Sequence, residues 1–146
     1  MAVQFATIAQ YRAFQGLPER EPRPSDPDGA AAFDAETFRL NALLQRATIP
    51  VRRAVRLSRV RYAPTGLPRD EDVAEVFAQA TAAQAVQFDE IGSASGNGAD
   101  YTSVSLIGVQ FSKATSAAKS NAEARVSAEA MDILAAAGLF TTRVAY

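Results

Sequence analysis

Carboxylates and arginines are the residues whose clustering in this chain could indicate chemistry, and the sequence contains neither histidine nor cysteine. Their absence removes the commonest general base, the thiolate nucleophile and the commonest zinc ligands. Four carboxylates do cluster, at Asp70, Glu71, Asp72 and Glu75. Helix capping and the positive end of a helix dipole explain them without catalysis, because they open an alanine-rich segment. The residue types favour a protein that is not an enzyme and needs no cofactor.

Two fragments match ligand-binding motifs only in part. The sequence Asp26-X-Asp28-Gly29 has the start of a calcium loop but lacks its later ligands and the closing glutamate. The glycine-rich stretch 92–98 neither follows a strand nor precedes a lysine, so it is not a phosphate-binding loop. No metal site and no nucleotide site is predicted.

The arginines are concentrated in one acid-free stretch, from Thr37 to Arg69. If this stretch is helical, Arg52, Arg56 and Arg59 share one side of it at i, i+4 and i+7. Three explanations remain open for this face: a solvated surface, pairing with acids of a neighbouring subunit, or phosphate binding. Phosphate binding is less favoured, because no aromatic residues are interleaved and the net charge is −1.

The spacing of apolar residues predicts a mainly helical fold. A short helix is expected over 8–15 between Thr7 and Gly16, followed by a proline-rich arm that is either solvated or draped on a neighbour. A long helix is expected to begin near Asp34, to continue in phase to about Tyr62, and to kink or restart at Pro50.

Two further helices are expected, over about 70–91 and 127–137, and the first should pack antiparallel to the long helix across a short turn at 65–68. Between them, 101–112 alternates as a β-hairpin or extended segment would. The expected organisation is an N-terminal helix and arm (1–33), a helical bundle with the β-like insertion (34–138) and a C-terminal tail (139–146). The tail is rich in β-branched and aromatic residues, which suits docking as a strand onto another protein. No segment is apolar enough to cross a membrane.

Several segments, taken in order, resemble the head-to-tail connector (adaptor) proteins of long-tailed bacteriophages, particularly those of actinobacterial phages. The resemblance covers about 34–139, and the proline-rich arm and Pro50 depart from it. In chain order the segments are Leu43-Leu44-Gln45-Arg46-Ala47, Val51-Arg52-Arg53-Ala54, Gly66-Leu67-Pro68, Asp70-X-Asp72-Val73-Ala74, Ala82-Ala83-Gln84, Val104-Ser105-Leu106-Ile107-Gly108-Val109-Gln110-Phe111 and Ser127-Ala128-Glu129-Ala130-X-X-Ile133-Leu134-Ala135-Ala136-Ala137-Gly138-Leu139.

The resemblance implies a structural virion protein that forms a ring of about twelve copies beneath the portal. Such a ring lies in the neck of the virion, joins the capsid to the tail and extends the DNA channel after assembly in the host cytoplasm. Its partners would be the portal protein, a tail-side stopper or tail-completion protein, and genomic DNA that passes without sequence-specific binding. Carried over to this chain, the portal-docking candidates are Phe140, Arg143, Val144 and Tyr146.

Assembly by complementary charge is the mechanism that we expect. The arginine face of one subunit would meet acids of the next, with Glu75, Asp89 and Glu90 as the candidates. Exposed ion pairs contribute little, so apolar burial would supply affinity and charge would set the register. The alternatives are a small helical DNA-binding or regulatory protein that uses its arginines on phosphates, and another neck or stopper component.

Overall fold

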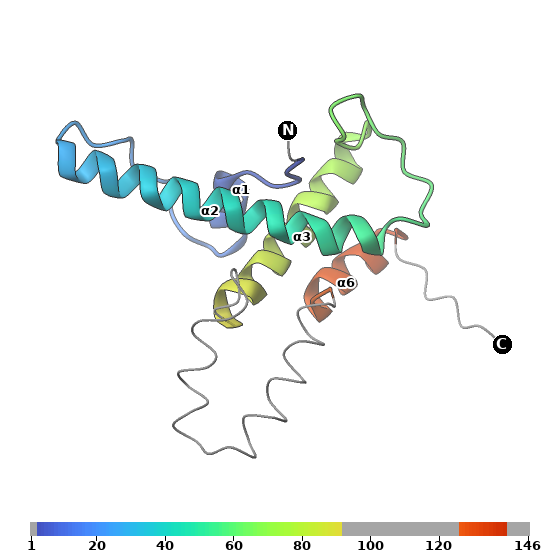
Figure 1. Cartoon of the computed structure of the whole chain (residues 1–146). Coiled ribbons are helices and arrows are strands. Elements are labelled where there is room, and N and C mark those ends of the chain that lie inside the picture. Colours follow the sequence, from blue (N-terminus) through green and yellow to red (C-terminus); the bar gives the residue numbers. More distant parts are fainter. Residues whose placement is uncertain (1–2, 92–125, 140–146) are drawn as a thin grey trace, which may run out of the picture.

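The computed structural model describes residues 3–91 and 126–139, and this part of the chain is mainly helical, as predicted. Its elements are α1 (Ile8–Phe14), α2 (Pro27–Ala54), α3 (Glu71–Ile91) and α6 (Ala128–Ala136) (Figure 1). The β-like insertion at 101–112 and the tail at 140–146 lie outside the described residues. None of the described helices is both long and apolar enough to cross a membrane.

Helix α1 begins and ends where the sequence predicts. Thr7 and Gln10 form a capping box in which each side chain accepts a hydrogen bond from the other residue's backbone amide. Gly16 follows the helix with φ = +70°, a conformation that glycine adopts without strain. Local sequence therefore fixes both ends of α1.

Helix α2 begins at Pro27, and the predicted start near Asp34 is wrong. The carboxylate of Asp26 caps the helix by accepting a 2.6 Å hydrogen bond from the Gly29 amide. Pro27 occupies the first helical position, where its missing N–H would have no partner in any case. Pro27, one of the prolines that suggested an extended arm, is thus the first residue of the helix.

The helix continues through Pro50 without a restart and ends at Ala54, short of the predicted Tyr62. After Val55 the backbone forms turns instead, with the Ser58 amide bonded to the Val55 carbonyl. The hydroxyl of Ser58 donates to the carbonyl of Leu139, so the chain beyond the helix contacts the segment that follows α6. The hydroxyl of Thr48, inside the helix, donates to the Leu44 carbonyl and accepts from the Phe5 amide.

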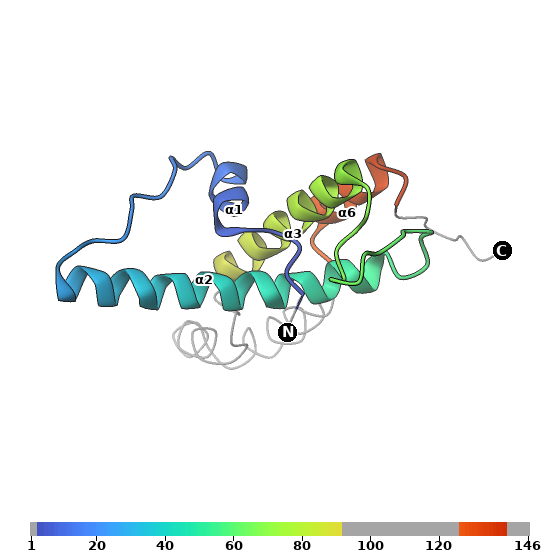
Figure 2. The ribbon, with the colours of Figure 1, turned by 90° about the horizontal axis from the view of Figure 1, so that it is seen from above.

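The connection 55–70 replaces the short turn expected between the two long helices. It closes into a narrow loop, in which the Ala63 amide donates to the Leu67 carbonyl and the Arg69 amide donates to the Arg61 carbonyl. Gly66 lies at its tip with φ = +83°, and a Cβ there would come within 2.7 Å of Val3. The longer connection lets α3 run back across α2 obliquely rather than alongside it (Figures 1 and 2).

Helix α3 is the centre of the described fold. Every residue from Ala80 to Ala85 is buried, which is typical of a helix packed on several sides. One apolar cluster joins α3 to α1 and α2, and includes Leu44 and Phe88. A second joins α3 to α6 and the end of α2, and includes Phe77 and Leu134. The run of alanines allows this close approach from both sides.

Candidate interaction surface at the end of helix α2

Seven arginines at the end of α2 and on the connection 55–70 are exposed, and none of them pairs with an acid within residues 3–91 and 126–139. The ion pairs found there involve three other arginines, Arg20, Arg23 and Arg39. The seven residues, called the arginine surface below, are Arg46, Arg52, Arg53, Arg56, Arg59, Arg61 and Arg69.

The predicted sharing of one helical face by Arg52, Arg56 and Arg59 is wrong. Arg52 lies in the last turn of α2, whereas Arg56 and Arg59 follow the end of the helix and lie on the connection. The apolar pattern stayed in phase beyond Val55 although the backbone had left the helix. All three side chains are nevertheless exposed and belong to the same acid-free stretch.

Part of this positive charge has a local explanation. Arg52 and Arg53 lie in the last turn of α2, where cations interact favourably with the negative end of the helix dipole. Burial raises the pKa of Tyr62, while the charge of Arg52 acts in the opposite direction, so Arg52 also acts on that phenol. No such role accounts for the remaining five arginines.

Exposed apolar side chains lie among these arginines, and the sequence patterns did not single them out. Ile49 is 59% exposed on α2, and Leu57 is 81% exposed between Arg56 and Arg59. The helical spacing of the apolar residues could have identified Ile49, since it falls outside the buried stripe of Leu44, Ala47 and Val51. Mixed apolar and charged surface of one sign suits a contact with another macromolecule better than simple solvation.

The acidic candidates divide into paired and unpaired groups. Asp89 is engaged within the chain, since Arg39 donates to it at 3.0 Å. Burial and then the charge of Asp89 raise the pKa of the neighbouring Tyr11. Glu75 and Glu90 are exposed and form no ion pair in the described part. Asp89 is therefore a poor candidate for contact with a neighbour.

Asp70, Glu71, Asp72 and Glu75 are also exposed at the start of α3, and we call them the acidic corner. No arginine pairs with them in the described ranges. As expected, Glu71 and Asp72 lie in the first turn, where the helix dipole favours them. The chain therefore carries two unpaired surfaces of opposite sign.

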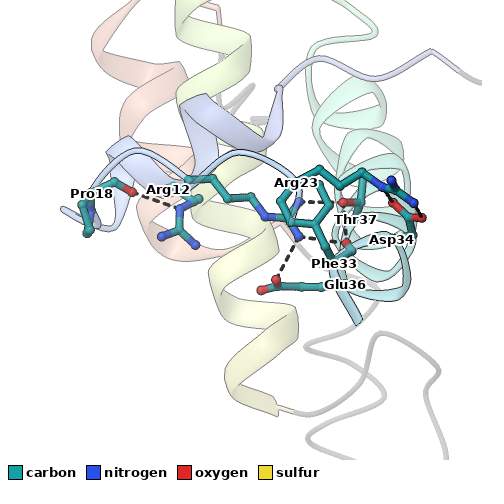
Figure 3. Close-up of polar contacts among 8 residues, drawn as sticks. Arg12, Pro18, Arg23, Phe33, Asp34, Glu36 and Thr37 are labelled. Carbon is teal, nitrogen blue, oxygen red and sulfur yellow. Dashed lines mark hydrogen bonds and ion pairs between the residues drawn. The ribbon is translucent and has the colours of Figure 1, made fainter. Parts of the chain in front are cut away.

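The proline-rich arm is attached to its own α2 through Arg20 and Arg23, while most of its residues remain exposed (Figure 3). Arg20 bonds the Thr37 hydroxyl, the Phe33 carbonyl and the Glu36 carboxylate, and its guanidinium is 3.7 Å from the centroid of the Phe33 ring.

Arg23 attaches the arm at a second point. Its Nε and Nη2 atoms donate hydrogen bonds to the two carboxylate oxygens of Asp34, at 2.9 and 2.7 Å. This contact lowers the pKa of Asp34. The order of charges, with arginines in the arm and acids on the early helix, was the signal that could have predicted the attachment.

The C-terminal tail starts beside the arginine surface. Leu139, the last described residue, packs in the cluster of α3 and α6, and its carbonyl accepts from Ser58. Leu57 and Arg59 flank that serine in the sequence. The portal-docking candidates Phe140, Arg143, Val144 and Tyr146 lie outside the described residues, but the chain enters them at this point.

Within the two described ranges, no three acidic side chains converge closely enough to hold a metal ion. Comparison with protein-family models, with curated proteins and with solved structures gave no match. The resemblance to phage connectors therefore stays a prediction.

Proposed function

We propose that this chain is a structural subunit that assembles with copies of itself into a ring and acts as the head-to-tail connector of a long-tailed bacteriophage. The observation that carries the proposal is the arginine surface, with exposed Ile49 and Leu57 among its residues, on the same chain as an unpaired acidic corner. A net charge of −1 means that charges of opposite sign can balance between copies.

A ring requires two different surfaces that fit each other, so that each subunit binds the next and the series closes. The arginines of α2 and the acidic corner at the start of α3 meet that requirement in charge, although the arginine surface as a whole adjoins the acidic corner in the sequence, at Arg69 and Asp70. Exposed ion pairs contribute only about 0–1 kcal/mol each. The exposed apolar side chains would supply most of the affinity, and the charges would set the register.

The proposed partners follow the resemblance and the position of the tail. The segment 140–146 would dock into the portal protein, and it leaves the described fold next to Ser58. A tail-side stopper or tail-completion protein would bind the opposite end of the ring. Genomic DNA would pass through the lumen in the virion neck without sequence-specific contacts, and no catalytic activity is proposed.

A DNA-binding or regulatory protein is the second candidate, favoured by the same seven exposed arginines. Neutralising Z phosphates makes the logarithm of affinity fall with the logarithm of salt concentration with a slope of about −0.9Z. A steep slope on duplex DNA would therefore support this candidate.

Native mass spectrometry of the full chain, with DNA binding measured in parallel, tests the two functions. Closed oligomers with little affinity for duplex DNA are expected for the connector. A monomer that binds duplex DNA with a steep salt dependence would overturn the connector proposal. The reversal Arg56→Glu, which replaces a positive charge of the arginine surface by a negative one, should weaken assembly. A second substitution that replaces an acid on the partner surface by a base should partly restore it.

A further inference from the structure

Helix α2 lies at one edge of the described fold, with α1, α3 and α6 all on the same side of it (Figure 2). Ile49 is 59% exposed on this helix. Its nearest neighbours on a helical surface are the residues three and four positions away, which are Gln45, Arg46, Arg52 and Arg53. All four are exposed. Ile49 is therefore an apolar side chain surrounded by three arginines and a glutamine.

Phe38 shows that exposure alone does not define this site. It is 78% exposed on the same helix, but its corresponding neighbours are Asp34, Ala35, Asn41 and Ala42. The only charged residue among these neighbours, Asp34, is already paired with Arg23. Phe38 thus lacks the unpaired charge of a single sign that surrounds Ile49.

A surface that fits Ile49 must offer apolar contact with carboxylates around it. A second α2 cannot do so in a symmetric contact centred on Ile49, because arginines would then face arginines. The acidic corner does have this chemistry. Its carboxylates enclose Val73 and Ala74 in the sequence, and both of these apolar residues are only partly buried.

We propose that Ile49 of one copy docks against the acidic corner of a second copy, at Val73 and Ala74, with Arg46, Arg52 and Arg53 facing its carboxylates. This inference rests on the proposed self-assembly and names the contact that produces it. Because the two surfaces differ, the contact is head-to-tail, and each of the two copies in contact keeps one unused surface with which to bind a further copy. A central apolar side chain with a charged rim is the usual anatomy of a stable contact.

Sedimentation velocity of the full chain over a range of concentrations tests the apolar part. Ile49→Ser should weaken association at least about tenfold, which is the effect of losing one anchor residue. Phe38→Ser is the matched control, since it removes an exposed apolar side chain from the same helix, and it should leave association unchanged. Circular dichroism melting should be the same for both variants.

Charge reversal tests the partner surface. Arg53→Glu and Glu75→Arg should each weaken association, and the double variant should recover part of the loss because the pair is restored with exchanged signs. Glu21→Arg is the control for the acid, since Glu21 is exposed on the arm and forms no ion pair in the described part. It should associate as the wild type does.

The outcomes separate this inference from the function on which it rests. A wild-type chain that stays monomeric at every concentration would overturn self-assembly itself. A wild type that assembles while Ile49→Ser behaves like Phe38→Ser would overturn only the role of Ile49. A double variant that associates no better than the single variants would overturn the acidic corner as the partner.

Discussion

Arg20 and Arg23 attach the N-terminal arm to α2 by contacts of different strength. The side chain of Arg20 is only 16% exposed, and it combines three hydrogen bonds with a stacked aromatic ring. Arg23 makes a bidentate pair with Asp34, but both side chains are more than half exposed. Water and salt therefore screen the second contact more than the first.

We expect Arg20→Ala to destabilise the fold by about 1–3 kcal/mol, because hydrogen bonds that involve charged groups contribute in this range and a partly buried site is weakly screened. Urea unfolding measures the loss. Arg23→Ala is the matched control and should have the smaller effect. An equal loss of unfolding free energy in the two variants would contradict the expectation that the more buried contact contributes more.

The Arg23–Asp34 pair should respond to acid. Its contact lowers the pKa of the Asp34 carboxyl in the folded chain, so its stabilisation is present above the ordinary aspartate pKa of about 4 and is lost as pH falls through the folded value. Titration of the Asp34 carboxyl by NMR should show a midpoint below the ordinary one. In Arg23→Ala the midpoint should return toward it, and an unchanged midpoint would exclude Arg23 as the cause.

At the scale of the elements, the helix ends that depend on neighbouring residues were predicted better than those that depend on contacts between distant parts of the chain. The capping box at Thr7 and the glycine at Gly16 are sequence-local, and the ends of α1 followed from them. The end of α2 did not, because the apolar spacing continues past Ala54 without a stop signal and the segment beyond the helix contacts Leu139, a residue far along the chain. The same error placed Arg56 and Arg59 on the helix, whereas they follow its end, so the charged residues of the candidate surface were predicted but their arrangement was not.

Asp26 gives the start of α2 a direct test. Asp26→Ala removes the acceptor of the Gly29 amide and should cost about 1 kcal/mol, the typical contribution of an N-cap. Hydrogen exchange of the first-turn amides should increase with it. Asp28→Ala, within the same turn, is the control and should cost less. If Asp34→Ala released these amides instead, the helix would begin where the sequence pattern had suggested.

At the scale of the molecule, α3 couples the two apolar clusters, and α6 depends on it. A helix as short as α6 is unstable alone in water. It is held by Leu134, fully buried against α3, and by Gln84 of α3, whose side-chain oxygen accepts the Ser127 amide at 2.7 Å. The position of Leu139, and with it the starting point of the tail, thus depends on packing at the centre of the fold.

Leu134→Ala should therefore act on the whole molecule. Removing this side chain leaves a cavity between α3 and α6 and should cost about 2–5 kcal/mol. Because Leu139 follows α6 by three residues, its contact with Ser58 should weaken as well, and hydrogen exchange over 126–139 should rise before global unfolding. Ala135→Ser is the matched control, since residue 135 is exposed on the same helix. Equal effects of the two substitutions on the urea midpoint would show that α6 is not held by its packing against α3.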